Sequence, residues 1–246
     1  ALVAAFFYGI QAFRTPEERE ERPALGVRGA ARWAYGLHSI GVLGTIAVLF
    51  IALFNHWFEF DYVWRHSSLD MPMQYIASCF WEGQEGSFLL WLTWHMILGW
   101  VLIRTAKTWE YGTLFALSLV QFFLASMLLA IYLGDLKLGS SPFILIRELP
   151  DNIGLPWTQM SDYLMRIPAF RDGQGLNPLL QNYWMVIHPP TLFLGFALTL
   201  VPFAYLIAGL WKKKLTEWVM PALPWALFGA GVLGIGIMMG AYWAYE

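Results

Sequence analysis

The chain of 246 residues is 58% hydrophobic and only 13% charged, with a mean hydropathy of +0.52. A soluble domain carries about 25% charged residues, so this composition excludes an ordinary soluble enzyme. The net charge of −2 leaves no basic excess for nucleic acid, and we expect no nucleic-acid partner. The single cysteine, Cys79, can form neither an internal disulfide nor a thiolate cluster. The composition predicts a polytopic membrane protein in contact with lipid.

Five stretches contain no Asp, Glu, Lys or Arg and are long enough, or nearly so, to cross a hydrocarbon core of about 30 Å. Because lipid offers no hydrogen bonds to the backbone, such stretches must be helices. The fourth span is the later part of an apolar stretch that starts at residue 184. We therefore predict an all-α fold, a transmembrane helical bundle that forms one membrane domain. Its expected spans are residues 33–54, 87–103, 111–133, 189–211 and 218–245.

The distribution of Lys and Arg predicts the orientation of these spans. Ten of the fifteen basic residues fall in segments 14–32, 104–110 and 212–217, which the positive-inside rule places in the cytoplasm. The two long segments between them, 55–86 and 134–188, carry the other five and alternate with the basic segments. We therefore expect two long outer loops, and loops of this length in a compact fold are usually functional.

The two ends of the chain indicate a fragment of a longer protein. Residues 1–13 are apolar but too short to span a membrane, and they resemble the tail of an earlier helix. The chain stops where the last expected span reaches the outer face. We expect further sequence on both sides.

The first outer loop contains the sequence Trp81-Glu82-Gly83-Gln84-Glu85-Gly86-Ser87, directly before the second expected span. Its two glycines predict a tight backbone, and Glu82 and Glu85 are expected at the membrane edge. A short surface helix should precede this motif. An acidic flank within an aromatic belt is the alternative interpretation.

The second outer loop ends in the sequence Asp172-Gly173-Gln174-Gly175-Leu176-Asn177-Pro178-Leu179-Leu180-Gln181. Asp-Gly is a turn signal, and Asn177 followed by Pro178 predicts an N-cap and the first position of a short surface helix.

His188 stands before Pro189 and Pro190. Because proline restricts the residue that precedes it and favours the first helical turn, we expect the fourth span to begin at one of these prolines. His188 would then lie just outside the helix, at the outer interface. The positive end of the helix dipole favours the neutral imidazole, which is the form that haem iron takes as an axial ligand. An interfacial histidine bonded to a loop carbonyl is the alternative.

His95 lies near the middle of the second expected span. An ionisable residue at that depth is a functional hypothesis by default. It is a candidate haem-iron ligand or proton relay, and a packing histidine is the alternative. His38, His56 and His66 carry no such signal.

Three motifs in order on the expected outer side resemble the cytochrome c maturation haem lyase family, CcmF and its relative NrfE. They are the segments 81–87, with Leu89, Leu90 and Trp91 behind it, 172–181, and Val186-Ile187-His188-Pro189-Pro190. Tyr62, His66, Ser67 and Ser68 are similar to a further short motif, and residues 233–246 resemble the lead-in to the family's tryptophan-rich segment. The resemblance covers roughly residues 33–246.

The resemblance implies a protein of the bacterial inner membrane that receives haem from a periplasmic haem chaperone. It would promote thioether bonds between haem and a Cys-x-x-Cys-His apocytochrome c, together with thiol-reducing maturation components. His188 would be the first of two periplasmic haem-contacting histidines. The second of these histidines would lie beyond Glu246. The tryptophan-rich segment and the membrane histidines that hold the family's b-type haem would lie there too. The resemblance identifies no catalytic residue within this chain, and we expect no activity of the fragment alone.

The motif residues expected near the haem site come from all three segments. They are Trp81, Glu82, Gly83, Glu85, Gly86, Asp172, Gly173, Gly175, Asn177, Pro178, Pro189 and Pro190.

Two departures from the family pattern are visible. Gln84 stands where the family often has histidine, and the stretch 144–171 is longer than usual. We interpret residues 151–171 as an outer insertion and a candidate partner surface. The alternative functions are another haem-handling member of the superfamily, either a haem-exporting subunit or a single-system synthase, and a transporter or quinone-binding respiratory subunit with His95 as proton relay.

Overall fold

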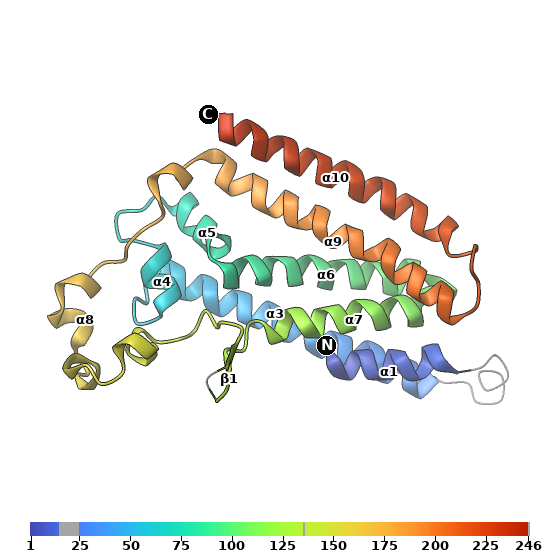
Figure 1. The fold of residues 1–246 in the computed structure, drawn as a ribbon, viewed down its shortest axis with the longest axis horizontal. Coiled ribbons are helices and arrows are strands. Elements are labelled where there is room, and N and C mark those ends of the chain that lie inside the picture. Colours follow the sequence, from blue (N-terminus) through green and yellow to red (C-terminus); the bar gives the residue numbers. More distant parts are fainter. Residues whose placement is uncertain (15–24, 135, 246) are drawn as a thin grey trace. The chain divides into compact units, whose positions relative to one another are not determined.

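The structure is a computed structural model that describes residues 1–14, 25–134 and 136–245, and the described chain is mainly helical (Figure 1). Among these described residues, four helices are long and apolar enough to cross a membrane. They are α3 (Leu25–Phe54), α6 (Gln84–Thr105), α9 (Tyr183–Trp211) and α10 (Val219–Tyr245). The predicted all-α, multi-pass membrane architecture is confirmed. Residues 15–24, within the first expected inner loop, lie outside the described residues.

The chain divides into two compact units. The helical unit comprises Ala1–Leu43, Trp91–Ala125 and Pro190–Glu246. The loop unit comprises Gly44–Leu90 and Ser126–Pro189, and these ranges include both expected outer loops. A single membrane domain stays a prediction.

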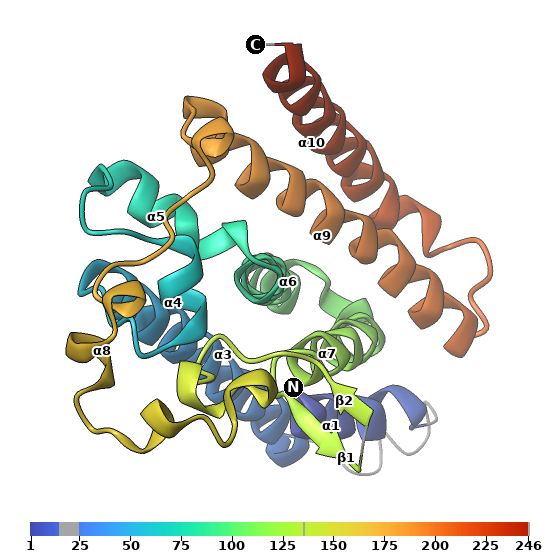
Figure 2. The same ribbon diagram turned by 60° about the vertical axis from the view of Figure 1, so that its left-hand side comes forward.

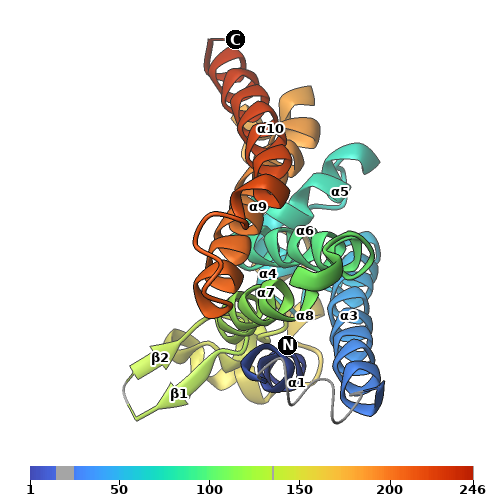
Figure 3. The same cartoon turned by 90° about the vertical axis from the view of Figure 1, so that its right-hand side faces the viewer.

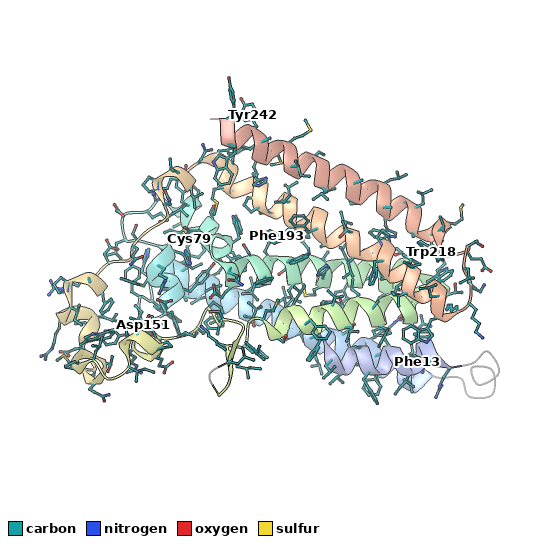
Figure 4. The ribbon with its side chains drawn as sticks, viewed as in Figure 1. Phe13, Cys79, Asp151, Phe193, Trp218 and Tyr242 are labelled. Carbon is teal, nitrogen blue, oxygen red and sulfur yellow. The ribbon has the colours of Figure 1, made fainter. Side chains whose placement is uncertain are left out.

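The helical unit is formed by α1 (Leu2–Phe13), α7 (Glu110–Ser126) and the larger parts of the four long helices. The short helix η1 (Lys107–Trp109) leads into α7. Helices α9 and α10 run side by side in Figures 1 and 2, and a Cβ on Gly195 of α9 would come within 2.7 Å of the Leu233 Cα of α10. Phe193 points from α9 toward α6, where its ring lies 6.1 Å from that of Trp91 (Figure 4). The largest fully buried side chains of this unit include Tyr8, Tyr35, Leu92, Leu102, Leu114, Leu117 and Leu198.

A carboxylate, that of Glu110, is buried within the helical unit. Glu110, the first residue of α7, is 2% exposed and binds Arg32 of α3 through two hydrogen bonds of 2.8 Å. Arg28, one turn earlier on α3, adds a third at 3.1 Å. Such paired, bidentate geometry is what allows a charge to be buried. The contact explains why an apolar helix begins with arginines.

The third expected span, residues 111–133, is corrected by the structure. Helix α7 ends at Ser126, and the chain forms the hairpin of β1 (Ile131–Leu133) and β2 (Leu136–Leu138). The strands are antiparallel, with Ile131 opposite Leu138 (Figures 2 and 3). The Met127 carbonyl accepts the N–H of Ser140, so the returning chain supplies backbone hydrogen bonds that a helix would otherwise provide. Hydropathy alone does not distinguish these alternatives.

The loop unit carries the predicted short surface helices. The first loop contains α4 (Asp61–His66) and α5 (Met73–Glu82). The second contains α8 (Tyr163–Arg166) and a series of single turns, namely η2 (Ile146–Glu148), η3 (Pro150–Asn152), η4 (Pro156–Gln159), η5 (Pro168–Phe170) and η6 (Pro178–Leu180).

The expected insertion, residues 151–171, has an aromatic core of its own. The rings of Trp157, Tyr163 and Phe170 pack together with centroids 5.0 to 5.8 Å apart. Trp64 of α4 packs on Phe170 and donates its indole N–H to the Ala169 carbonyl at 3.0 Å. The insertion is therefore fastened to the first loop by specific contacts.

Candidate functional site

The corner between α5 and α6 is organised by the hydroxyl of Tyr62, which lies on α4. This hydroxyl donates to the Phe80 carbonyl at 2.9 Å and accepts the Gly83 N–H at 3.1 Å. Burial raises the pKa of Tyr62 well above its ordinary value, so the hydroxyl keeps the proton that it donates. One buried side chain therefore holds the end of α5 and the start of the motif that follows it.

The glycines of the first motif are required by close approach. A Cβ on Gly86 would lie 1.5 Å from the Phe80 carbonyl oxygen, and one on Gly83 would lie 2.5 Å from the Tyr62 ring. The predicted tight backbone is confirmed. The second span begins at Gln84 of α6, earlier than the expected residue 87, and Glu85 lies in the first turn of this helix. The Ser87 hydroxyl donates to the Trp81 carbonyl at 2.8 Å and closes the corner.

The start of α9 corrects the predicted position of His188. The helix begins at Tyr183, because the Asn182 side chain accepts the Trp184 N–H at 3.0 Å and caps it. His188 therefore lies inside α9, where it is half-buried, rather than before the helix. The fourth span starts before Pro189 and Pro190.

A contact from the first motif compensates for one of these prolines. Pro189 has no N–H, so the Met185 carbonyl four residues earlier receives no donor from its own helix. The Trp81 indole N–H donates to this carbonyl at 2.8 Å. Met185 is only 4% exposed, and water is a poor substitute for the indole there. The first and third motifs therefore meet one helical turn from His188.

The second motif is attached to the end of α4. Asp172 accepts the backbone N–H of Leu69 at 2.9 Å and that of Gly173 at 2.7 Å. A Cβ on Gly173 would lie 1.9 Å from the Ser67 carbonyl oxygen, so only glycine fits. Gly175, with a φ of +76°, donates its N–H to the same carbonyl at 3.1 Å. Hydrogen bonds to the backbone thus join the Asp172–Gly175 segment to Ser67 and Leu69, which follow α4 about a hundred positions earlier.

The predicted cap at Asn177 is confirmed. Its side chain accepts the Leu179 N–H at 3.0 Å, and Pro178 is the first residue of the single turn η6. Leu176 is buried at 2% exposure, which anchors the motif in the loop unit. These contacts explain the local order of the second motif. Within the described residues, Asn177 makes no hydrogen bond to a titratable side chain.

Sequence reasoning missed one pair of side chains. His66 is the last residue of α4 and Glu82 the last of α5, and His66 Nδ1 lies 2.9 Å from the Glu82 carboxylate. Sixteen positions separate them. Each belongs to a different short motif of the sequence, and nothing in the sequence alone pairs the two side chains.

His95 is buried in α6 at 1% exposure, and neither of its ring nitrogens has a hydrogen-bond partner within the described residues. Its ring lies 5.8 Å from that of Trp91. No group of three His, Cys, Asp or Glu residues that could hold a metal ion occurs in the part of the chain that the structure describes. A ligand role for His95 stays a prediction.

Residues 81–246 match the model of the family described as Cytochrome C assembly protein. The chain is 33% identical over 216 residues to the cytochrome c-type biogenesis protein CcmF of Pseudomonas fluorescens, covering 87% of this chain and 29% of that protein. It is 30% identical over 207 residues to CcmF of Escherichia coli K12, covering 84% and 28%. For NrfE of Haemophilus influenzae the identity is 28% over 193 residues, covering 76% and 26%.

A solved structure entitled Cytochrome c Heme Lyase CcmF has the same fold, with a TM-score of 0.72 and 24% identity over 100% of this chain and 34% of that one. This chain spans less than a third of the length of the three relatives from Pseudomonas fluorescens, Escherichia coli and Haemophilus influenzae, and about a third of the solved chain. The family match begins at Trp81 and includes all three motifs entirely. The chain belongs to the family of cytochrome c assembly proteins.

Proposed function

We propose that this protein acts in the maturation of c-type cytochromes, as part of a haem lyase that attaches haem covalently to apocytochrome c. The family membership and the names of the relatives support this function. Haem would be received from a periplasmic haem chaperone, and thiol-reducing components would keep the apocytochrome cysteines available.

The proposed location is the bacterial inner membrane, with the loop unit on the periplasmic side. Four apolar helices support the membrane location. The two long segments 55–86 and 134–188 together contain five basic residues, and the other three segments contain ten. This distribution supports the orientation through the positive-inside rule.

His188 is the proposed axial or positioning ligand of haem. Its surroundings fit a flat, apolar group that needs one imidazole: the side chain is half-buried on α9, and Trp184 lies one turn earlier on the same helix. Haem when bound would supply the iron and the reactive vinyl groups. The observation that carries the proposal is the Trp81 contact with the Met185 carbonyl, since it ties two family motifs together beside His188.

The role of the chain in this reaction is mainly positional. The first turns of α9 are fixed by the Asn182 cap and by the Trp81 contact, so the imidazole of His188 can hold a ligand in one orientation. Orientation alone contributes a large share of the rate of many enzymatic reactions. The Asp172–Gly175 segment and the Tyr62 corner keep the surrounding loop backbone in place.

The test is substitution of His188 in the full-length protein, within cells that carry the other maturation components. His188→Ala should abolish covalent haem attachment to a reporter cytochrome c, measured by haem staining, and added imidazole should restore part of it. His56→Gly, which alters another histidine of the loop unit, serves as the control. Undiminished attachment in His188→Ala would contradict the proposal, and haem transport without attachment would favour a haem-exporting relative.

A further inference from the structure

The His66–Glu82 pair has a defined geometry. The imidazole Nδ1 lies 2.9 Å from a Glu82 carboxylate oxygen, and the two side chains are 20% and 14% exposed. A carboxylate that accepts a hydrogen bond from one ring nitrogen fixes the orientation and the tautomer of an imidazole. With the proton on Nδ1, the lone pair is on Nε2.

Two further contacts hold the ring. The Tyr62 ring lies beside it, with centroids 4.4 Å apart and an angle of 52° between the planes. A Cβ on Gly83 would lie 2.7 Å from Nε2, so the absence of a side chain at this position is what leaves room for that nitrogen. The imidazole is therefore positioned by α4, by the end of α5 and by the glycine of the first motif.

The second nitrogen of this imidazole is available. Within the described residues Nε2 has no hydrogen-bond partner, and His66 lines a cavity of about 360 Å³ in the loop unit. A cavity of this size accommodates a cysteine side chain with its neighbouring peptide groups. The lining also includes the hydroxyl-bearing residues Ser140 and Ser141.

The charged groups around the cavity balance one another. Arg65 is already paired with Asp61 at 2.8 Å, which leaves Lys137 and Glu85 as the other charged lining residues. The charged and titratable groups facing His66 are thus Glu82, Tyr62, Asp61, Arg65, Glu85 and Lys137. They form neither a strongly anionic nor a strongly cationic cavity, so the oriented imidazole is its distinguishing chemical group.

We propose that His66, oriented by Glu82, is a general base that accepts the proton of a substrate cysteine thiol. The proposal rests on the function proposed above, because thioether formation is the reaction that consumes such a thiol. An imidazole that has one nitrogen on a carboxylate and the other without a protein partner, on a side chain that lines a cavity, is a typical arrangement for proton transfer.

The step conserves atoms and electrons. The S–H bond breaks and its proton passes to His66 Nε2, and the sulfur electron pair forms a C–S bond to one carbon of the haem vinyl group. The π electron pair of that vinyl group takes a proton at the other carbon, which can be the proton that His66 returns. Nothing is oxidised or reduced, and the imidazole ends as it began.

The position of the pair in the chain fits this assignment. Glu82 directly follows Trp81, whose indole contacts α9 one turn from His188. Both histidines belong to the loop unit. The first motif thus supplies Glu82, which orients the His66 imidazole, and Trp81, which binds the backbone of α9 beside His188.

The test uses the full-length protein, purified with bound haem and supplied with a Cys-x-x-Cys-His peptide under reducing conditions. His66→Ala should slow thioether formation about 100-fold, the usual scale of general acid–base catalysis. Added imidazole should restore part of the rate. The deficit should shrink from about pH 7 to about pH 9, because an exposed thiol ionises by itself near pH 8.5. Glu82→Gln should show a smaller loss of the same kind.

Controls separate this inference from the proposed function and from misfolding. His56→Gly should leave the rate unchanged. The bound haem and its absorption spectrum should be unaltered in His66→Ala, and loss of haem there would overturn the inference by making His66 a ligand. A normal rate in both His66→Ala and Glu82→Gln, with His188→Ala inactive, would also overturn the inference and leave the proposed function standing. Normal attachment in His188→Ala would instead overturn the proposed function.

Discussion

The indole N–H of Trp81 donates to the backbone carbonyl of Met185, and this carbonyl is the one that Pro189 deprives of its helical donor. Trp81→Phe keeps the ring but removes the donor. We expect a loss of about 1–3 kcal/mol in the free energy of unfolding, because a buried carbonyl is left unpaired. Thermal unfolding in detergent measures this, with Trp57→Phe, an exposed tryptophan of the same unit, as control.

A second substitution tests the role of the proline. Pro189→Ala supplies an N–H that can bond to Met185 within α9, so Trp81→Phe should then cost less than about 0.5 kcal/mol. The full penalty in the Pro189→Ala background would show that the proline-freed carbonyl is not the reason for the contact.

Gly173 is expected to tolerate no side chain. Gly173→Ala places a methyl group 1.9 Å from the Ser67 carbonyl oxygen, so the Asp172–Gly175 segment must move. We predict a destabilisation of about 1–3 kcal/mol and faster proteolysis of the second outer loop. Gly44→Ala, where nothing lies within 4 Å, should instead be neutral or stabilising because alanine favours a helix. Equal protease resistance of both variants would contradict the steric account.

Glu110 is expected to be important for stability. Glu110→Gln removes the charge that compensates Arg28 and Arg32, and we predict a loss of about 3 kcal/mol in unfolding free energy. Glu217→Gln breaks an exposed pair with Lys214 and should change stability by less than about 1 kcal/mol. Urea or thermal denaturation of the two variants gives the comparison, and similar stabilities would contradict it.

The thiol of Cys79 should be unreactive in the folded protein. Burial raises its pKa to about 12, so the folded state keeps a proton that the unfolded state loses near pH 9. This group therefore contributes stability that is present below about pH 9 and decreases as pH rises from there toward 12. Maleimide labelling at pH 7 should be slow in the folded protein and fast once the protein unfolds. Labelling of the folded protein at the rate of a free thiol would contradict this prediction.

The low reactivity of Cys79 makes introduced cysteines useful as reporters of orientation. Asp151→Cys, on η3, should react with a membrane-impermeant maleimide in intact spheroplasts. Thr216→Cys, in the basic segment 212–217, should react only after lysis. The reverse pattern would invert the proposed topology.

The sequence predicted the membrane helices because their signal is local: four apolar stretches emerge as α3, α6, α9 and α10. It failed at residues 127–133, where the deciding interaction is a backbone bond from Ser140 to Met127. Apolar composition is compatible with a helix and with a short hairpin alike.

The local backbone structure of the motifs could be predicted from the sequence, but the contacts between the motifs could not. The cap at Asn177 follows from two adjacent residue types, and it is present. The prediction that His188 precedes the helix is wrong, because it assumes that a proline ends the helix before it. The helical hydrogen bond that Pro189 removes from the Met185 carbonyl is replaced by one from Trp81, more than a hundred residues away. The His66–Glu82 pair likewise depends on how α4 and α5 pack.

The burial of Cys79 on α5 also bears on chemical selectivity (Figure 4). Its thiol donates to the Tyr75 carbonyl at 3.1 Å, and the 246 residues contain no other cysteine. A catalyst whose proposed substrates are peptide thiols and reactive vinyl groups would be inactivated if its own sulfur added to the vinyl group or formed a mixed disulfide. With its one thiol enclosed and protonated, this part of the protein is protected from becoming its own substrate.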